Sequence, residues 1–374
     1  MAVSYPMPTL SNVIDNDLGP GSSQVSSRRM NHRRTTIADV AERAGVSVAT
    51  VSKVLNNRWG VAPDTYTRVR HVIEEMGYSA SLGASSLRST RTNVIAVLVT
   101  EIEPFSAELL KGVSQGIHSS DYELLIYVGG RHRSDPGWER QYVSRLSGTL
   151  ADGMIIVTPA SDEISAAAPV VAVDPHDGLT KIPCIASDNY SGAKTATAHL
   201  VGLGHRRIAF LAGREGLESS ILRERGFRDA MAEGGVPVDE SLVRLGGYRA
   251  EDSVRPAHDL LEPHDRPTAV FAANDQSALE IVHVAVELGL EVPGDLSVVG
   301  FDNIPESALS APPLTTVAQP IQQMGIRAVE TLIAMIGGAE PPPRVTLPTE
   351  FVLRQSTAPP RTETASTTST SDAL

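Results

Sequence analysis

From Thr92 onward, short apolar runs rich in β-forming residues alternate with longer amphipathic stretches. The runs include VIAVLV, ELLIYV, GMIIV, PVVAV, RIAFLAG, TAVFAA and LSVVGF. Strand and helix candidates in alternation predict parallel sheets covered by helices. The alternation continues through residues 92–356, which is long enough for two such sheets. We therefore expect an α/β body of two doubly wound lobes, with a ligand in the cleft outside the carboxyl ends of the strands.

The stretch TTIADVAERAGVSVATVSKVLNN, which precedes this body, predicts two short helices that meet at a tight corner. Thr36 and Asp39 fit a capping box at the start of the first helix. Gly45 is a turn residue that tolerates a positive φ, and Ser47 can cap the second helix. On the second helix we expect one face to point inward and the other outward: Val51, Val54 and Leu55 inward, and Val48, Ala49, Ser52 and Lys53 outward.

A third predicted helix follows, from Asp64 to Met76, with Pro63 at its first turn and Gly77 at its end. Three short helices around a small core, with a tight turn between the first two, describe a helix-turn-helix, which is a DNA-binding motif. An all-α cap on the following domain would have the same outline. The geometry alone leaves both alternatives open.

The formal charge of −12 is unevenly distributed along the chain. Residues 1–91 contain 11 Lys/Arg and 7 Asp/Glu, a balance of +4, whereas the remainder contains 21 and 37, a balance of −16. A basic head on an acidic body suits a protein whose head alone meets an anion such as DNA. An ordinary solvated surface can carry the same charge, so this balance permits DNA binding without establishing it.

Composition and motifs argue against several other classes. The single cysteine, Cys184, excludes an internal disulfide framework and a Cys-based zinc site, and it favours a reducing cytoplasm. No apolar run is long enough to span a bilayer, and the N-terminus has no secretory pattern. Residues 1–34 and 357–374 have the composition of a disordered leader and tail. Gly202-Leu203-Gly204 lacks the third glycine of a dinucleotide fingerprint, and there is no Walker loop, no serine elbow and no histidine pair at metal-ligand spacing. We expect no catalysis, no cofactor and no metal.

The head is very similar to the DNA-binding domain of the lactose-repressor (LacI/GalR) family through TIADVAERAGVSVATVSKVLNN and VAPDTYTRVRHVIEEMGY. The resemblance implies that residues 35–78 bind double-stranded DNA with the second helix in the major groove. Val48 and Ala49 would lead the base contacts, and Lys53 stands where the family usually has Arg. The implied DNA-binding residues are Thr36, Ser47, Val48, Ala49, Thr50, Ser52, Lys53 and Asn56.

The linker SASLGASSLRSTR, residues 79–91, resembles the hinge helix of this family, which folds when the dimer binds its operator. Leu87 matches the leucine that wedges into the minor groove at the centre of the operator. The match is imperfect, because Ala80-Ser81 replace a common Pro-Asn pair and Gly83 weakens the helix. A plain flexible linker is the alternative.

The body resembles the same family through DNYSGAKTATAHLVGLGHRRIAFLAG, LRERGFRDAM, FAANDQSALE and VPGDLSVVGFDNIPESALSAPPLTTV. This implies a periplasmic-binding-protein-like fold over residues 92–356, in which the chain crosses between the lobes three times. The first lobe would comprise residues 92–188 with a return near 319–332. The second would comprise residues 189–318 with a C-terminal piece.

The resemblance also implies effector-binding residues in the cleft: Phe105, Arg223, Tyr248, Asn274 and Asp302. Arginine donates several hydrogen bonds, aspartate accepts from hydroxyls, and asparagine does both. Aromatic rings offer faces for sugar rings. Each residue has a plainer alternative, because Arg223 could be a surface helix residue, Asp302 a turn residue and Phe105 a core residue.

These features favour a ligand-responsive transcriptional regulator, usually a repressor in this family. It would bind a pseudo-palindromic operator as a homodimer, possibly a tetramer, and respond to a small sugar or sugar derivative. A solute-binding protein of a transport system would share the body, but the head and the missing signal peptide disfavour it. A cytoplasmic α/β enzyme is a third class, for which the sequence contains no catalytic constellation.

Overall fold

The computed structural model describes residues 35–55, 59–78, 91–130, 137–159, 164, 166–176 and 181–361. The chain divides into two compact units, residues 1–80 and 81–374, which are described separately. The leader, nearly all of the linker, Asn56 and Leu87 lie outside the described residues. Within the described residues, no helix has the length and apolar character needed to cross a bilayer.

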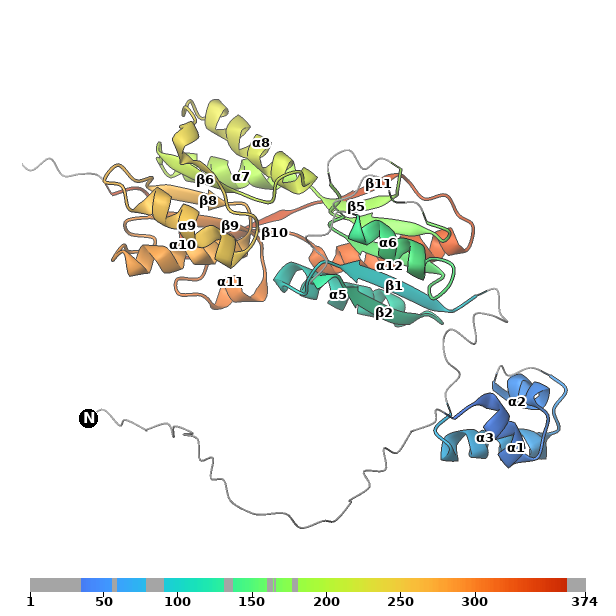
Figure 1. The fold of residues 1–374 in the computed structure, drawn as a ribbon. Helices are drawn as coiled ribbons and strands as arrows, with labels where there is room; N and C mark the ends of the chain where they lie inside the picture. The colour runs from blue at the N-terminus through green and yellow to red at the C-terminus, as the bar shows by residue number, and fades with distance from the viewer. Residues whose placement is uncertain are drawn as a thin grey trace, which may run out of the picture. The chain divides into compact units, whose positions relative to one another are not determined.

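The head consists of three helices: α1 (Ile37–Ala44), α2 (Val48–Leu55) and α3 (Pro63–Glu75) (Figure 1). The predicted capping box is present, since Thr36 Oγ1 accepts from the Asp39 amide at 3.3 Å and the Asp39 carboxylate accepts from the Thr36 amide at 2.7 Å. Gly45 closes α1 with a φ of +66°. A small aliphatic core joins the helices: Val40, Ala41, Ala44, Val51, Val54, Val69 and Val72.

The predicted outward face of α2 is exposed at two of its four residues. Ala49 and Lys53 are exposed, whereas Ser52 is half-buried and Val48 is half-buried and packs against the head core. Val48 is therefore only partly outward, because its position in the first turn of α2 brings its side chain against the aliphatic core. Ser47 caps α2 as predicted, with its hydroxyl accepting from the Thr50 amide at 3.2 Å.

The first lobe of the body is built on a six-stranded parallel sheet in the order β11-β5-β4-β3-β1-β2. Its strands are β1 (Val94–Val99), β2 (Glu123–Val128), β3 (Gly153–Val157), β4 (Val170–Val173), β5 (Cys184–Ser187) and β11 (Arg344–Leu347). Helices α5 (Pro104–Ile117) and α12 (Ile321–Ile336) pack together against one core, and α6 (Trp138–Leu146) packs into the other (Figure 1).

The second lobe has a six-stranded sheet in the order β12-β10-β9-β8-β6-β7, in which only β12 runs antiparallel. Its strands are β6 (Ile208–Ala212), β7 (Val243–Leu245), β8 (Ala269–Ala272), β9 (Ser297–Asp302), β10 (Thr315–Ala318) and β12 (Glu350–Val352). One face carries α7 (Asn189–Gly202) and α8 (Glu218–Glu233), and the other α9 (Ala250–Leu261) and α10 (Asp275–Glu287). A short 3-10 turn (Glu240–Leu242) and α11 (Pro305–Leu309) complete it.

The chain passes between the lobes three times, between β5 and α7, between β10 and α12, and between β11 and β12. The return to the first lobe is longer than the predicted 319–332. It includes all of α12 and also β11, which pairs with β5 from Arg344↔Cys184 to Leu347↔Ser187. The sequence did not predict this strand, because the segment that precedes it, residues 337–343, is rich in glycine and proline.

The C-terminal segment is ordered further than predicted. Residues 357–361 were expected to begin a disordered tail, but the carbonyl of Ala358 accepts from Ser297 Oγ at 2.9 Å and lies 2.9 Å from His205 Nε2. Arg361 pairs with Asp295 at 2.5 Å and with Glu291 at 2.8 Å. These long-range partners hold a segment whose own composition predicts disorder. Residues 362–374 lie outside the described residues.

Candidate functional site

A pocket of about 460 Å³ lies between the two lobes of the body. The first lobe contributes Thr100, Glu101, Glu103, Phe105, Ser106, Trp138, Glu139, Thr158 and Asp174 to its lining. The second lobe contributes Arg214, Leu217, Arg223, Gly247, Tyr248, Arg249, Asp252, Asn274 and Asp302, and the crossing segment contributes Gln319. All five effector-binding residues predicted from the sequence therefore line one cavity.

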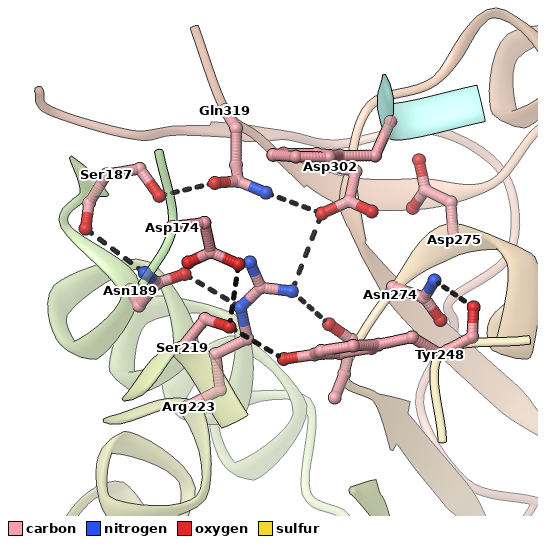
Figure 2. A network of polar contacts seen from close by, with 12 residues as sticks. Asp174, Ser187, Asn189, Ser219, Arg223, Tyr248, Asn274, Asp275, Asp302 and Gln319 are labelled. Carbon is pink, nitrogen blue, oxygen red and sulfur yellow. Dashed lines mark hydrogen bonds and ion pairs between the residues drawn. The ribbon is translucent and has the colours of Figure 1, made fainter. Parts of the chain in front are cut away.

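Arg223 lies at the centre of the polar network in the pocket (Figure 2). The side chain is 4% exposed, and its Nε donates to Asn189 Oδ1 at 2.8 Å. Its Nη1 donates to the Ala273 carbonyl and lies 3.5 Å from Asp302 Oδ1. The guanidinium also lies over the Phe301 ring, 3.8 Å from the centroid. These contacts fix its orientation, so it is a preorganised donor and not a surface arginine.

Asp302 is the last residue of β9 and has a φ of +115°, an unusual conformation for a residue with a side chain. Its Oδ1 accepts from Gln319 Nε2 at 2.6 Å. Burial raises the pKa of Asp302 well above its usual value, while the nearby Arg223 charge opposes that rise. A hydroxyl donor or a cation from a ligand would stabilise the ionised form of this carboxylate.

Asp174 is a pocket residue that the sequence reasoning missed. It follows β4 in the first lobe and accepts a hydrogen bond from Ser219 Oγ of the second lobe at 3.1 Å. Burial raises the pKa of Asp174, and Arg223 opposes the rise. The sequence does indicate Asp174, because it follows the apolar run VVAV just as Asp302 follows the apolar run VVGF. Two carboxylates, one from each lobe, thus lie near the same arginine.

Tyr248 and Asn274 reach the pocket from neighbouring segments of the second lobe. Asn274 caps α10, with its Oδ1 accepting from the Ser277 amide at 3.1 Å and its Nδ2 donating to the Tyr248 carbonyl at 2.9 Å. Tyr248 has a φ of +72°, and its ring crosses Gly213 where a Cβ would lie only 2.1 Å away. Asn274 therefore both shapes this loop and lines the cavity, and it keeps one amide hydrogen for another acceptor.

The first lobe presents aromatic and acidic side chains. Phe105 lies in the first turn of α5, and Trp138, which the sequence reasoning also missed, begins α6. Glu103 caps α5 by accepting from the Phe105 amide at 2.7 Å and the Ser106 amide at 2.8 Å. Burial raises the pKa of Glu103 despite these hydrogen bonds. The lining therefore combines ring faces with hydrogen-bond acceptors.

The lining contains six carboxyl side chains and three arginines, and Glu101 pairs with Arg249 between the lobes. These side chains can form hydrogen bonds with a small polar molecule from several sides at once. Among the described residues, no group of three or more His, Cys, Asp or Glu side chains could hold a metal ion.

In the head, the predicted DNA-binding residues belong to one short region. Ala49 and Lys53 are exposed on α2, and Ser52 is half-buried there. Ser47 and Thr50 hydroxyls lie 2.9 Å apart at the start of α2, and the Thr36 hydroxyl donates to Asp39 at 2.7 Å. The exposed face of α2 is the surface on which the sequence placed base contacts.

Comparisons with known proteins agree with both units. A model described as bacterial regulatory proteins, lacI family, matches residues 36–81, and one described as a periplasmic binding protein-like domain matches residues 197–357. The HTH-type transcriptional regulator DegA of Bacillus subtilis (strain 168) is 36% identical over 337 residues, which cover 87% of this chain and 99% of that protein.

Two solved structures are similar over most of the chain. The lac repressor dimer bound to operator and the anti-inducer ONPF has a TM-score of 0.75 and 27% identity, covering 87% of this chain and 100% of that one. The complex of the transcriptional regulator CelR with cellobiose has a TM-score of 0.66 and 31% identity, covering 86% and 100%. With the three-helix head, the two-lobed body and near full-length similarity to DegA, this chain belongs to the lacI family of bacterial regulatory proteins.

Proposed function

We propose that this family member is a ligand-responsive repressor that binds a pseudo-palindromic operator as a homodimer in the cytoplasm. The observation that carries this function is one chain in which a helix-turn-helix precedes a body with a polar pocket between two lobes. One helix-turn-helix contacts only a half-site, so tight binding needs two heads related by a two-fold axis. The role of Leu87 as a minor-groove wedge is part of the same proposal.

We assign the effector to the pocket, with Arg223, Asn274 and Asp302 as hydrogen-bonding residues and Phe105 and Tyr248 as ring contacts. Support comes from their convergence on one cavity and from the fixed orientation of Arg223. A cavity of about 460 Å³ is within the range used for small molecules. The similar protein DegA is a transcriptional regulator, which supports a binding role for the pocket.

A sugar or sugar derivative fits this lining better than a purine does. Six carboxyl side chains can accept hydrogen bonds from a set of hydroxyl groups, which a purine base lacks. The aromatic side chains of both lobes can lie against sugar rings. The similar protein CelR is bound to cellobiose in its solved structure, which makes cellobiose a sensible first candidate.

Occupancy of the pocket would control DNA binding through the dimer. A ligand shifts DNA affinity only as far as it binds two arrangements of the protein with different affinity. Because the pocket is lined from both lobes, a bound molecule favours one relative position of the lobes. That position would set the spacing of the two heads.

The test is selection of DNA from a random library by the full-length protein. Enriched sequences should be two-fold pseudo-palindromes, and the logarithm of affinity should fall linearly with the logarithm of salt concentration. Titration of the selected DNA with a panel of sugars then identifies molecules that change affinity. Failure to enrich any sequence at low salt, from a folded sample, would contradict the function. A solute-binding protein, the second class considered, predicts that failure together with sugar binding.

A further inference from the structure

Two oppositely charged side chains meet across the solvent side of the pocket. Glu101 follows β1 in the first lobe, Arg249 precedes α9 in the second, and the two form an ion pair. Both line the pocket, yet their side chains are 35% and 22% exposed, whereas the side chain of the central Arg223 is 4% exposed. The pair is therefore closer to solvent than the polar centre of the pocket is. We call Glu101 and Arg249 the mouth pair.

The backbone next to each member of the mouth pair has a defined conformation. Gly247 and Tyr248 have consecutive left-handed conformations, with φ of +70° and +72°, and they precede Arg249, which is the N-cap of α9 and pairs with the first lobe. On the other side, Glu103 caps α5 two residues after Glu101 and fixes that loop. The two charges are thus presented to each other by loops that also shape the pocket.

A second ion pair joins the lobes at a different place. Arg344 of β11 lies 2.9 Å from Glu218 of α8, and neither residue lines the pocket. Among the ion pairs of the described residues, these two connect the lobes. Both pairs can stabilise this arrangement of the lobes, but of the two only the mouth pair lines the pocket.

We propose that the mouth pair is a gate, closed over the pocket in this conformation, which must separate for a small molecule to enter or leave. The proposal rests on the proposed function of the pocket as the effector site. Glu101 and Arg249 are positioning residues here, and their charges need not touch the effector. A partly exposed ion pair shifts an open–closed equilibrium by about 1.5- to 5-fold and is weakened by salt.

The two tryptophans of the chain permit a test without a known effector. Trp138 lines the pocket and is 7% exposed, while Trp59 belongs to the head. With Trp59→Phe as background, quenching of Trp138 by the neutral probe acrylamide reports access to the cavity. Arg249→Ala and Glu101→Ala should each raise the quenching constant about 1.5- to 5-fold. Arg327→Ala is the matched control, because it removes an exposed ion pair with Glu330 within one helix of the first lobe, and it should leave the quenching constant unchanged.

The charge-swapped protein, Glu101→Arg with Arg249→Glu, separates pairing from any other role of these residues. Pairing predicts that the swap restores low quenching, and that about 1 M NaCl raises quenching in the parent but not in Arg249→Ala. Unchanged quenching in both single variants, an equal rise in Arg327→Ala, or no recovery in the swap would each overturn the gate. Because these measurements use neither effector nor DNA, their failure leaves the regulator function standing. Failure of the DNA selection, in turn, would contradict the regulator function but would not alter the quenching of Trp138.

Discussion

Gln319 donates from Nε2 to Asp302 Oδ1 over 2.6 Å, and its Oε1 accepts from the Ser187 hydroxyl. Gln319 lies on the second crossing between the lobes, and Ser187 lies beside the first. One amide side chain therefore connects both crossings to a carboxylate in the pocket (Figure 2). Any change in the position or ionisation of Asp302 acts directly on the segments that join the lobes.

Gln319→Ala should lower the free energy of unfolding of the body by about 1–3 kcal/mol, because it removes one donor from the buried Asp302 carboxylate and the acceptor of the buried Ser187 hydroxyl. Urea denaturation followed by circular dichroism measures the loss. Gln322→Ala is the matched control, because its amide donates to Glu108 at an exposed site at 2.7 Å. The control should stay within about 0.5 kcal/mol of the parent. Equal losses of unfolding free energy in the two variants would contradict a stabilising role for the buried hydrogen bonds of Gln319.

Lys53→Ala should weaken operator binding by about 1–3 kcal/mol if the ammonium reads a base edge, and the loss should concentrate at one base pair per half-site. Fluorescence anisotropy with single-base operator variants locates that position. Uniform weakening over all variants would instead identify a phosphate contact. Arg225→Ala, an exposed arginine of the body, controls for the change in net charge and should bind DNA as the parent does.

Asp275 predicts a pH dependence of stability. Burial raises its pKa from 3.8 to about 7, although Thr316 and the Ile304 amide donate to its carboxylate. Between these two values the unfolded chain has lost this proton and the folded chain retains it. The contribution of Asp275 to stability is therefore complete below about pH 4 and declines as pH rises toward 7, by at most about 1.4 kcal/mol per pH unit.

Asp275→Asn removes this titration. The stability advantage of the parent over the variant should shrink steadily in urea denaturation series from pH 4 to pH 7. A difference that is constant over that range, or that grows with pH, would mean that Asp275 is ionised in the folded protein.

Truncation tests the ordered C-terminal segment. A chain that ends at Ser356 loses the Ala358 carbonyl that Ser297 uses and the ion pairs of Arg361. It should be destabilised by about 1–3 kcal/mol relative to a chain that ends at Arg361. Thermal unfolding of the two truncated proteins measures this directly, and identical transition temperatures would show that residues 357–361 contribute nothing.

The local parts of the fold were predictable from the sequence because their signals are local. Thr36 and Asp39 contact each other three residues apart, and the positive φ of Gly45 follows from its place after a helical stripe. The alternation of strands and helices likewise predicted two doubly wound lobes, since each unit is short and punctuated by turns. The pocket residues Arg223 and Asp302 were found only through resemblance to a family.

The features that the sequence did not predict depend on contacts with residues far away in the chain. Ala358 is held by His205 and Ser297 from far along the chain, so the composition of the tail predicted disorder. The position of Asp174 after a strand is visible in the sequence, but its contact with Ser219 of the second lobe is not. Val48 shows the same limit at a smaller scale, because its burial is set by the other helices of the head.

The central claim is that the pocket controls the head, and one measurement tests it most directly. Operator affinity is measured by anisotropy with and without a sugar that calorimetry shows to bind, for the parent, Asp302→Ala and Arg223→Ala. Both variants should still bind operator but bind the sugar at least about ten-fold more weakly, because each leaves a buried charged partner. At sugar concentrations that change the operator affinity of the parent, theirs should remain unchanged. A full response to the sugar in both variants would contradict the account.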